Sequence, residues 1–492
     1  MALIAAGRGL RLPVSRMGQA LTIASVSATN SVFTYSTKTP ASRRAISSSE
    51  KRPATSMIEP AVETLVPPAG EIPPRAAPLS ILPLTNIIRS LITNTISSSH
   101  MLLPPSMRIM AMLAHSTNPI LNPDRNPLLG LFMKYTFYAQ FCAGEKPSEV
   151  RQTIKGLKDI GFNGVILCYA KEVVLSEDQI KSLSGAKGQE TTHNIENEIK
   201  PWAEGTLETV RLASPGDYVA LKFTGAGSLA LYQLQNRLPA SPYLANSIDS
   251  ICKLARERGV RLLFDAEQDA LQLGIDDWTI EYARKYNTEA HDAVIYGTYQ
   301  AYKKNCPQII SEHLAIAQKE GWTLGVKLVR GAYLGSDPRH LLHDTKADTD
   351  ACFDAIAESV LTREWTSAVK GEGVYPNTAM VLATHNADSV RQARAIADAG
   401  RAKSYISCAQ LQGMADEVSC EIVDSKSPGA SVGASVQLPV YKYLVWGSIG
   451  ECMKYLLRRA QENKDAVQRT RSTRDAMFGE LVRRCKAVVG LA

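Results

Sequence analysis

The sequence lacks the features by which disulfide-rich, zinc-binding and membrane-spanning proteins are recognised. Its nine cysteines include no C-x-x-C pair, so neither a disulfide framework nor a cysteine-rich zinc site is indicated, and we expect reduced thiols. No stretch reaches the ~18 uninterrupted apolar residues of a membrane-spanning helix, because Arg89, Pro104 and Arg108 divide the richest segment, residues 81–114. The composition, 45% hydrophobic and 21% charged, is that of a folded globular chain.

Acidic residues are missing from the first 49 positions, which contain six Lys and Arg residues and many Ser and Thr residues. An Arg-rich, acid-poor terminus of this kind is typical of mitochondrial transit peptides. We predict such a peptide over residues 1–52 and therefore a mitochondrial location; the alternative is a disordered tail without a targeting role. Beyond residue 52 the chain has 47 basic and 47 acidic residues, so its excess of positive charge gives no reason to expect a nucleic-acid partner.

Composition divides the remainder of the chain into four parts. Eight prolines lie in residues 53–83, which we predict to be an extended linker. Apolar patches separated by Pro/Asn turns predict a helical arm over residues 84–149. We predict a βα domain over residues 150–465, in which the polar, acidic segment 176–214 is a surface insertion. Residues 466–492 are expected to form a polar or helical tail.

Within the predicted βα domain, short apolar runs alternate with amphipathic helical stretches, which is the pattern of repeated βα units. Eight such runs can be placed, at residues 164–169, 218–223, 260–264, 293–299, 324–329, 379–383, 403–407 and 437–441. Eight alternations over a domain of this length suit a closed (βα)8 barrel of the TIM type, an α/β fold, better than an open doubly wound sheet.

Polar or ionisable side chains stand at the ends of most of these runs, where a barrel has its functional face. They are Lys222, Asp265, Glu267, Thr298, Gln300, Lys327, Arg330, His385, Gln410 and Tyr443. Asp265 and Glu267 share one face of their strand, which is unfavourable unless cations meet them. A structural layer of ion pairs at the barrel mouth is the alternative to a functional site. No second His or Cys is spaced to share a metal with His385, so we expect no metal site.

A helix-forming segment after the last strand contains two adjacent arginines, Arg458 and Arg459. Neighbouring helical residues diverge by about 100°, so the two guanidinium groups can hold one small anion from two sides. Their forked donors suit a carboxylate. The alternative is an arginine pair on a solvated helix surface.

A glycine-rich segment at residues 225–230 fits the pattern G-x-G-x-x-A and follows a predicted strand. Together with Asp249 it could indicate a dinucleotide-binding fold. This interpretation is disfavoured, because a single match is weak and because the preceding strand carries Lys222, whose charge would lie awkwardly within a parallel sheet.

Four segments together resemble the proline dehydrogenase family, the FAD-dependent proline oxidases of mitochondria. They are residues 263–267, 325–333, 383–386 and 455–463, in this order within the region from about residue 210 to residue 465. The resemblance implies a distorted (βα)8 barrel whose eighth helix lies over its mouth. It also implies FAD-dependent oxidation of L-proline to pyrroline-5-carboxylate, with electrons passed to ubiquinone, and peripheral association with the matrix side of the mitochondrial inner membrane.

The resemblance further assigns roles to individual residues. Lys222, Arg458 and Arg459 would bind the proline carboxylate. Tyr443 and Tyr455 would pack against its ring, and Asp265 would orient these groups. Whether hydroxyproline is also a substrate stays open.

Cofactor contacts implied by the resemblance would come from Lys327, Arg330, Gly331, Ala332, His385 and either Thr298 or Gln300. Lys327 and Arg330 stand where bacterial members have Arg and Lys, so Lys327 offers the flavin one donor instead of a fork. Two alternatives are a flavin barrel similar to methylenetetrahydrofolate reductase and a barrel that has lost activity and only binds.

Overall fold

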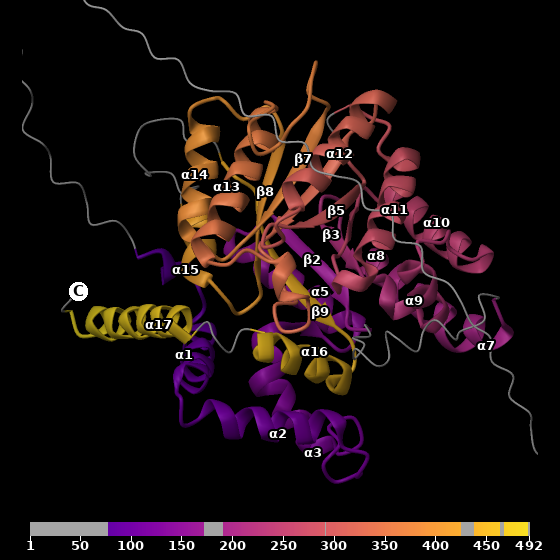
Figure 1. Ribbon diagram of the computed structural model, residues 1–492. Coiled ribbons are helices and arrows are strands. Elements are labelled where there is room, and N and C mark those ends of the chain that lie inside the picture. The colour runs from indigo at the N-terminus through magenta and orange to yellow at the C-terminus, as the bar shows by residue number, and fades with distance from the viewer. Residues whose placement is uncertain (1–76, 172–189, 291, 425–436, 463–466, 491–492) are drawn as a thin grey trace, which may run out of the picture. The chain divides into compact units, whose positions relative to one another are not determined.

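The computed structural model describes residues 77–171, 190–290, 292–424, 437–462 and 467–490 (Figure 1). All of these residues belong to one compact unit that begins at Pro73. The predicted transit peptide, most of the predicted linker and residues 176–189 of the predicted insertion lie outside the described residues.

Eight parallel strands close into a barrel, which confirms the predicted fold class. The strands are β2 (Gly164–Tyr169), β3 (Tyr218–Leu221), β4 (Arg261–Phe264), β5 (Ile295–Gln300), β6 (Leu324–Val329), β7 (Thr378–Ala383), β8 (Tyr405–Leu411) and β9 (Val440–Trp446). Each pairs with the next in sequence, and β9 closes the ring on β2 with Ile166 opposite Tyr443. A closed ring excludes the dinucleotide-binding interpretation, which requires an open sheet.

A ninth strand, β1 (Cys142–Gly144), lies parallel to β9 outside the ring and was not predicted. Three residues are too few to show an alternating pattern, so the sequence carries no signal for it. It places the start of the barrel domain before residue 150.

Helices surround the barrel, and α8 (Lys200–Leu212) corrects the prediction of a surface insertion. Trp202 and Val210 on this helix are 2% and 0% exposed, so residues 200–212 are a packed layer of the barrel wall. The acidic composition concealed an apolar face with helical spacing.

The other wall helices are α5 (Pro147–Ile160), α9 (Ser228–Gln235), α10 (Pro242–Glu257), α11 (Asp269–Tyr286), α12 (Cys306–Glu320), α13 (Lys346–Thr362), α14 (Ala387–Asp398) and α15 (Asp416–Asp424). Shorter pieces are η2 (Lys134–Tyr138), α4 (Ala139–Phe141), α7 (Thr192–Asn194), η4 (Ile195–Ile199), η5 (Phe223–Ala226) and η6 (Arg339–Leu341).

The last barrel helix, α16 (Ile449–Glu462), does not join the wall but lies between the barrel and the N-terminal arm (Figure 1). The arm consists of α1 (Leu84–Ser98), α2 (Leu103–His115) and α3 (Pro127–Met133), so residues 84–133 are largely helical as expected. Met110 and Leu113 of α2 pack in one cluster with Cys452 and Leu456 of α16. The arm therefore covers the face of α16 that points away from the barrel.

The C-terminal helix α17 (Val467–Val488) packs along α1, in agreement with a helical tail. The described end of the predicted linker, in contrast, is not extended. Pro78–Ile81 form the 3-10 helix η1, and Leu79 is buried in a cluster with Ile87, Cys420 and Met477. The prolines concealed this local apolar contact, which can be made only once α15 and α17 are in place.

Candidate active site

Strand alternation divides the predicted residues between the two faces of the barrel wall. The inner face carries Cys168, Ala220, Leu263, Val381, Ala409 and Tyr443, which form one buried cluster with Tyr455 of α16. Lys222, Asp265, Thr298, Gln300 and Lys327 occupy positions of the same inward parity and are all at most 8% exposed. This burial is consistent with the expectation that the five side chains point into one space at the carboxyl end of the strands.

A buried ion pair lies at the centre of this cluster. Lys327 Nζ is 2.5 Å from Asp265 Oδ1, and Tyr443 OH donates to Asp265 Oδ2 at 2.8 Å. Each carboxylate oxygen thus has a donor, which offsets the cost of removing the charges from water. Burial and the neighbouring Asp265 charge raise the pKa of Tyr443 well above its ordinary value, so its hydroxyl remains a proton donor in the hydrogen bond.

Three further cations surround the ring of Tyr455. Lys222 Nζ lies 5.5 Å from the ring centroid, and the guanidinium carbons of Arg458 and Arg459 lie 6.0 and 5.5 Å from it. Because the arginines follow Tyr455 by three and four residues, one helix face presents both of them beside that ring. Both arginines are half-buried, which is inconsistent with the alternative of a fully solvated pair.

Lys222 is held in its charged form despite its burial. Removal from water alone lowers the pKa of its ammonium group, but its proximity to Tyr333 and Asp265 raises that pKa above its ordinary value. The arrangement therefore concentrates positive charge at the end of β3 and on α16, where a small carboxylate could be bound.

The carboxylate of Glu267 fastens the loop after β3, and the charges of Lys222 and Asp265 also act on it. Its carboxylate accepts hydrogen bonds from the backbone N–H of Thr224, at 3.1 Å, and from the Thr224 hydroxyl. It is 2% exposed. Burial raises the pKa of Glu267 to about 7, although Thr224 and Lys222 act in the opposite direction.

The two candidates on β5 for a flavin contact differ in their hydrogen bonding. The hydroxyl of Thr298 donates to the Phe264 carbonyl at 2.8 Å. Gln300 is 4% exposed, and its amide nitrogen Nε2 has no hydrogen-bond partner among the described residues. Leaving a buried donor without a partner is costly, so a bound group that accepts from Gln300 would remove that cost.

A glycine and a histidine complete the carboxyl end of β6 and β7. Gly331 has φ of +140°, and a Cβ atom there would approach the Tyr302 ring within 2.5 Å, so no larger residue fits without movement. Ala332 next to it is half-buried. His385 is also half-buried, and its Nε2 accepts from the backbone N–H of Leu411 at 3.1 Å.

Two of the polar strand-end residues lie on the outer face of the barrel wall instead. Arg330 donates to Asp350, Thr384 and Ser389 at 2.7, 2.6 and 2.9 Å, towards α13 and α14. Gln410 accepts from the Ser419 hydroxyl of α15 at 3.0 Å. Arg330 and Gln410 each come one residue after an inward-facing position. Because successive side chains of a strand point to opposite faces of the sheet, both point outward. The structure therefore does not bring Arg330 into the cluster of Lys222, Lys327 and Asp265.

Sequence reasoning missed Cys168 and Tyr333. Cys168 lies on β2 inside the barrel, where burial raises the pKa of its thiol and the charges of Lys222 and Asp265 act on it. Its inward parity could have been derived from the predicted strand. Tyr333 is 5% exposed and lies two residues after Gly331, in a loop for which no periodic pattern exists.

The glycine-rich segment at residues 225–230 has a packing role. A Cβ atom on Gly225 would come within 2.4 Å of the Lys171 carbonyl, and Gly227 has φ of +100° beside the Glu198 side chain. These glycines allow η5 and α9 to approach the turn before α8.

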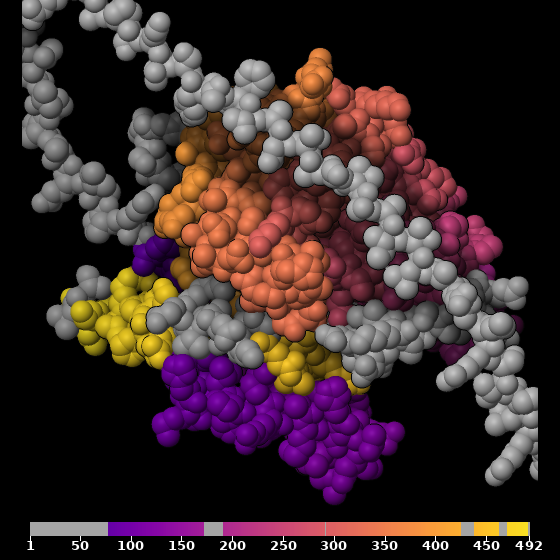
Figure 2. Space-filling model, viewed as in Figure 1, coloured from indigo at the N-terminus to yellow at the C-terminus, as the bar shows by residue number. Residues whose placement is uncertain are grey.

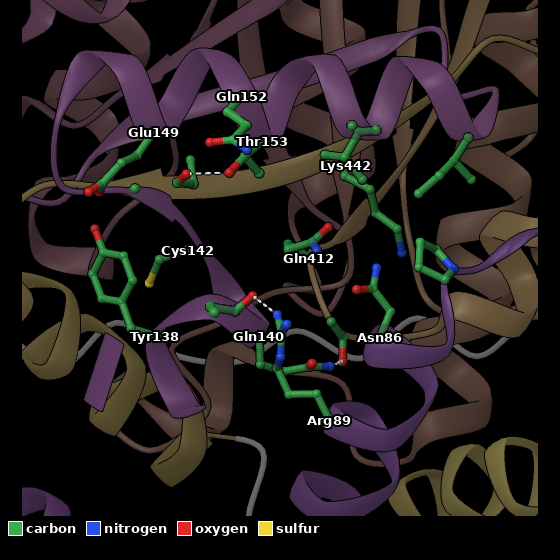
Figure 3. A pocket seen from close by; sticks show the side chains of 18 of the residues that line it. Asn86, Arg89, Tyr138, Gln140, Cys142, Glu149, Gln152, Thr153, Gln412 and Lys442 are labelled. Carbon is green, nitrogen blue, oxygen red and sulfur yellow. Dashed lines mark hydrogen bonds between the residues drawn. The ribbon is translucent and has the colours of Figure 1, made fainter. Parts of the chain in front are cut away.

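A separate cavity of about 560 Å³ lies between the arm, α5 and the ends of β8 and β9 (Figure 3). Arg89 donates to the Ala139 carbonyl at 2.7 Å on one side, and Lys442 is ion-paired with Asp416 at 2.7 Å on the other. None of the predicted site residues lines this cavity, so it is distinct from the cluster inside the barrel.

Comparison with known proteins gives concordant findings. The sequence pattern of the family described as proline dehydrogenase matches residues 150–472. A probable mitochondrial proline dehydrogenase of Schizosaccharomyces pombe is 30% identical over 406 residues, which are 72% of this chain and 80% of that protein. Mitochondrial proline dehydrogenase 1 of Arabidopsis thaliana is 30% identical over 412 residues, 75% of this chain and 77% of the relative.

A solved structure supports the fold alone, because its sequence identity is only 18%. It is proline utilization A from Bdellovibrio bacteriovorus inactivated by N-propargylglycine, which superposes with a TM-score of 0.55 over 77% of this chain and 38% of its own length. This chain thus corresponds to about two fifths of that larger protein.

Proposed function

The chain belongs to the proline dehydrogenase family, and from this premise we propose that it oxidises L-proline to pyrroline-5-carboxylate with FAD as cofactor. We propose further that ubiquinone receives the electrons and that the enzyme works in the mitochondrion, on the matrix side of the inner membrane. The mitochondrial names of the relatives and the acid-poor first 52 residues favour that location.

The observation that carries the proposal is the gathering of Lys222, Arg458 and Arg459 around Tyr455. A proline carboxylate bound by these cations would be fixed in position and orientation by charge-assisted hydrogen bonds. Tyr455 and Tyr443 offer flat apolar surfaces for the pyrrolidine ring. The ring carbon next to nitrogen would then always present the same face to the interior of the barrel, which is a positioning effect.

Asp265 acts as a positioning residue for this arrangement. It holds Lys327 and Tyr443 at 2.5 and 2.8 Å, so both side chains are fixed before substrate binds. Oxidation of the carbon–nitrogen bond removes a hydride from carbon, and the substrate amine must already have lost its proton. Burial of this cluster excludes water from the reacting atoms.

FAD, when bound, supplies the hydride acceptor. The residues present fit such a group, because Gln300 has a buried donor to share and Lys327 brings a positive charge that would stabilise a ring gaining electrons. We therefore favour Gln300 over Thr298 as a flavin contact, together with Lys327, His385 and the backbone of Gly331 and Ala332. Arg330 stays a predicted contact, which it could make only outside the barrel interior.

The proposal is tested by mixing the purified protein anaerobically with L-proline, hydroxyproline or NADH and recording the flavin absorbance. We expect bleaching by proline. Bleaching by NADH alone would favour the reductase-like alternative, and a colourless protein without flavin would favour a barrel that only binds. Bleaching by hydroxyproline in preference to proline would change the substrate.

The carboxylate site is tested by the single variants Arg458→Ala and Arg459→Ala. Each variant removes one charge-assisted hydrogen-bonded pair, which contributes about 1.5–3 kcal/mol to the free energy of binding. This loss corresponds to an increase in KM for proline of about 10- to 100-fold. Bound flavin should be unchanged. Lys454→Ala, at an exposed position of the same helix, is the control and should leave KM unaltered. Unchanged KM in both arginine variants would contradict the assignment.

A further inference from the structure

Exposed apolar side chains are concentrated in the N-terminal arm. Of the twenty-two large hydrophobic side chains exposed among the described residues, thirteen lie between Leu84 and Tyr135. We call the face formed by the exposed residues of α1, α2 and α3 the arm surface; in Figure 2 the arm is a continuous indigo band next to α16. Large apolar patches on a protein surface mark a site where something else binds.

Helix α1 is apolar on its exposed face, unlike an ordinary surface helix. Its exposed face carries Leu84, Ile88 and Ile92, at intervals of four residues, with exposures of 47%, 42% and 57%. Its buried face carries Ile87, at 0%, together with the polar Ser90 and Thr93, which are 1% and 7% exposed. A helix face in contact with water only is normally polar, so the exposed apolar face of α1 is expected to have a partner of its own.

Helices α2 and α3, the next two helices of the arm, also expose apolar side chains. The inner face of α2 is already occupied by α16, yet Ile109 and Met112 on its outer face are 53% and 50% exposed. On α3, Leu128 and Phe132 are 79% and 64% exposed and lie one helical turn apart. The arm surface is therefore apolar on three consecutive helices, none of whose exposed faces is needed for contact with the barrel.

Charge indicates the kind of partner. Residues 77–144 contain a single acid, Asp124, whose carboxylate accepts from the backbone N–H of Gly450 at 2.9 Å, at the start of α16. Arg108 and Arg125 are exposed beside the apolar residues. Two copies of this surface would bring like charges together, whereas a bilayer with anionic lipid offers both apolar depth and negative charge.

We propose that the arm surface docks the protein on the face of a lipid bilayer that contains anionic lipid, with α1, α2 and α3 lying at the interface. Among the described residues, no helix is long and apolar enough to cross a membrane, so the contact would be peripheral. The inference deepens the proposed function and rests on it in one respect: a ubiquinone acceptor is found in a membrane, which the enzyme must reach.

The test is cosedimentation of the full-length protein with vesicles of phosphatidylcholine, with or without phosphatidylglycerol. Binding is expected to be stronger to the mixed vesicles. The variant Ile88→Gln/Ile92→Gln/Leu128→Gln/Phe132→Gln should lower the partition coefficient at least about tenfold, or about 1.4 kcal/mol. The pair Ile88→Gln/Ile92→Gln alone, a milder change, should lower it measurably.

Two matched variants make the test specific. Leu273→Gln/Val374→Gln removes two apolar side chains, 50% and 83% exposed, from outside the arm and should bind vesicles as the parent protein does. Arg108→Gln/Arg125→Gln should abolish the preference for phosphatidylglycerol. Each variant should retain proline-dependent reduction of a water-soluble acceptor dye, which also reports correct folding.

Absence of vesicle binding by the parent protein, or equal binding by the arm variants, would overturn the proposal. A second outcome would also overturn it: the parent protein is an oligomer that does not bind vesicles, and the arm variants are monomers. That result would identify a second copy of the chain as the partner of the arm surface. If the parent protein bound vesicles but did not oxidise proline, the proposed function would be refuted and the docking proposal would still hold.

Discussion

The buried carboxyl of Glu267 predicts a specific dependence of stability on pH. Its pKa is raised by burial from the ordinary value of 4.5 to about 7 in the folded protein. The folded state therefore favours the protonated form. The stabilisation that this proton provides is complete below about pH 4.5 and is lost as the pH rises through about 7.

The magnitude follows from the difference between the two pKa values. At about 1.36 kcal/mol per unit, ionisation of Glu267 costs the folded state about 3 kcal/mol above pH 7. Glu267→Gln keeps the shape, can still accept from the Thr224 N–H and cannot ionise. The variant should therefore match the parent protein below about pH 4.5 and become more stable than it by up to about 3 kcal/mol above pH 7.

The assay is urea unfolding of both proteins at a series of pH values, followed by tryptophan fluorescence. The difference between the two curves isolates Glu267 from other titrating groups. Glu257→Gln, at an exposed position on α10, is the control for loss of a surface carboxyl and should not reproduce the gain in stability above pH 7. Parallel stability curves for Glu267→Gln and the parent protein would refute the reasoning, because the carboxyl would then titrate alike in the folded and unfolded chain.

Two further predictions concern the barrel mouth. Gln300→Leu should reduce the flavin retained on purification, measured by absorbance, without loss of stability, because Nε2 of the lost amide has no partner among the described residues. Gln410→Leu, which breaks buried hydrogen bonds to Ser419 of α15 and to the Thr384 carbonyl just after β7, should instead lower the free energy of unfolding by about 1–3 kcal/mol and leave the flavin content unchanged. Gly331→Ala should lower the thermal midpoint through overpacking against Tyr302, at a cost of about 1–3 kcal/mol, whereas Gly335→Ala in the same loop, with open space around it, should not. Equal effects within either pair would contradict the stated cause.

The barrel could be predicted because its strands are buried on both faces. Such strands appear as short apolar runs, and β2 and β6 were placed with their observed bounds. The gathering of Asp265, Lys327 and Tyr443 also followed from sequence, since strand ends meet at one edge and alternate residues share a face.

Other features depend on tertiary structure that no local pattern records. The outward orientation of Arg330 is decided by a single residue of register at the end of β6. The burial of Trp202 depends on its indole N–H donating to the Lys222 carbonyl at 3.0 Å, twenty residues away in the chain. The packing of η1 against α17 joins segments about 400 residues apart, a distance over which composition gives no information.

The position of α16 links two properties that are usually separate. This helix holds Arg458 and Arg459 on one side and rests on Met110 and Leu113 of the arm on the other, with its first turn held by Asp124. Helix α2 thus packs directly on the helix that carries the two guanidinium groups. If the arginines bind substrate and the arm contacts lipid as proposed, a displacement of α2 at the bilayer would reach the substrate-binding helix through this one contact, and the affinity for proline would respond to membrane binding.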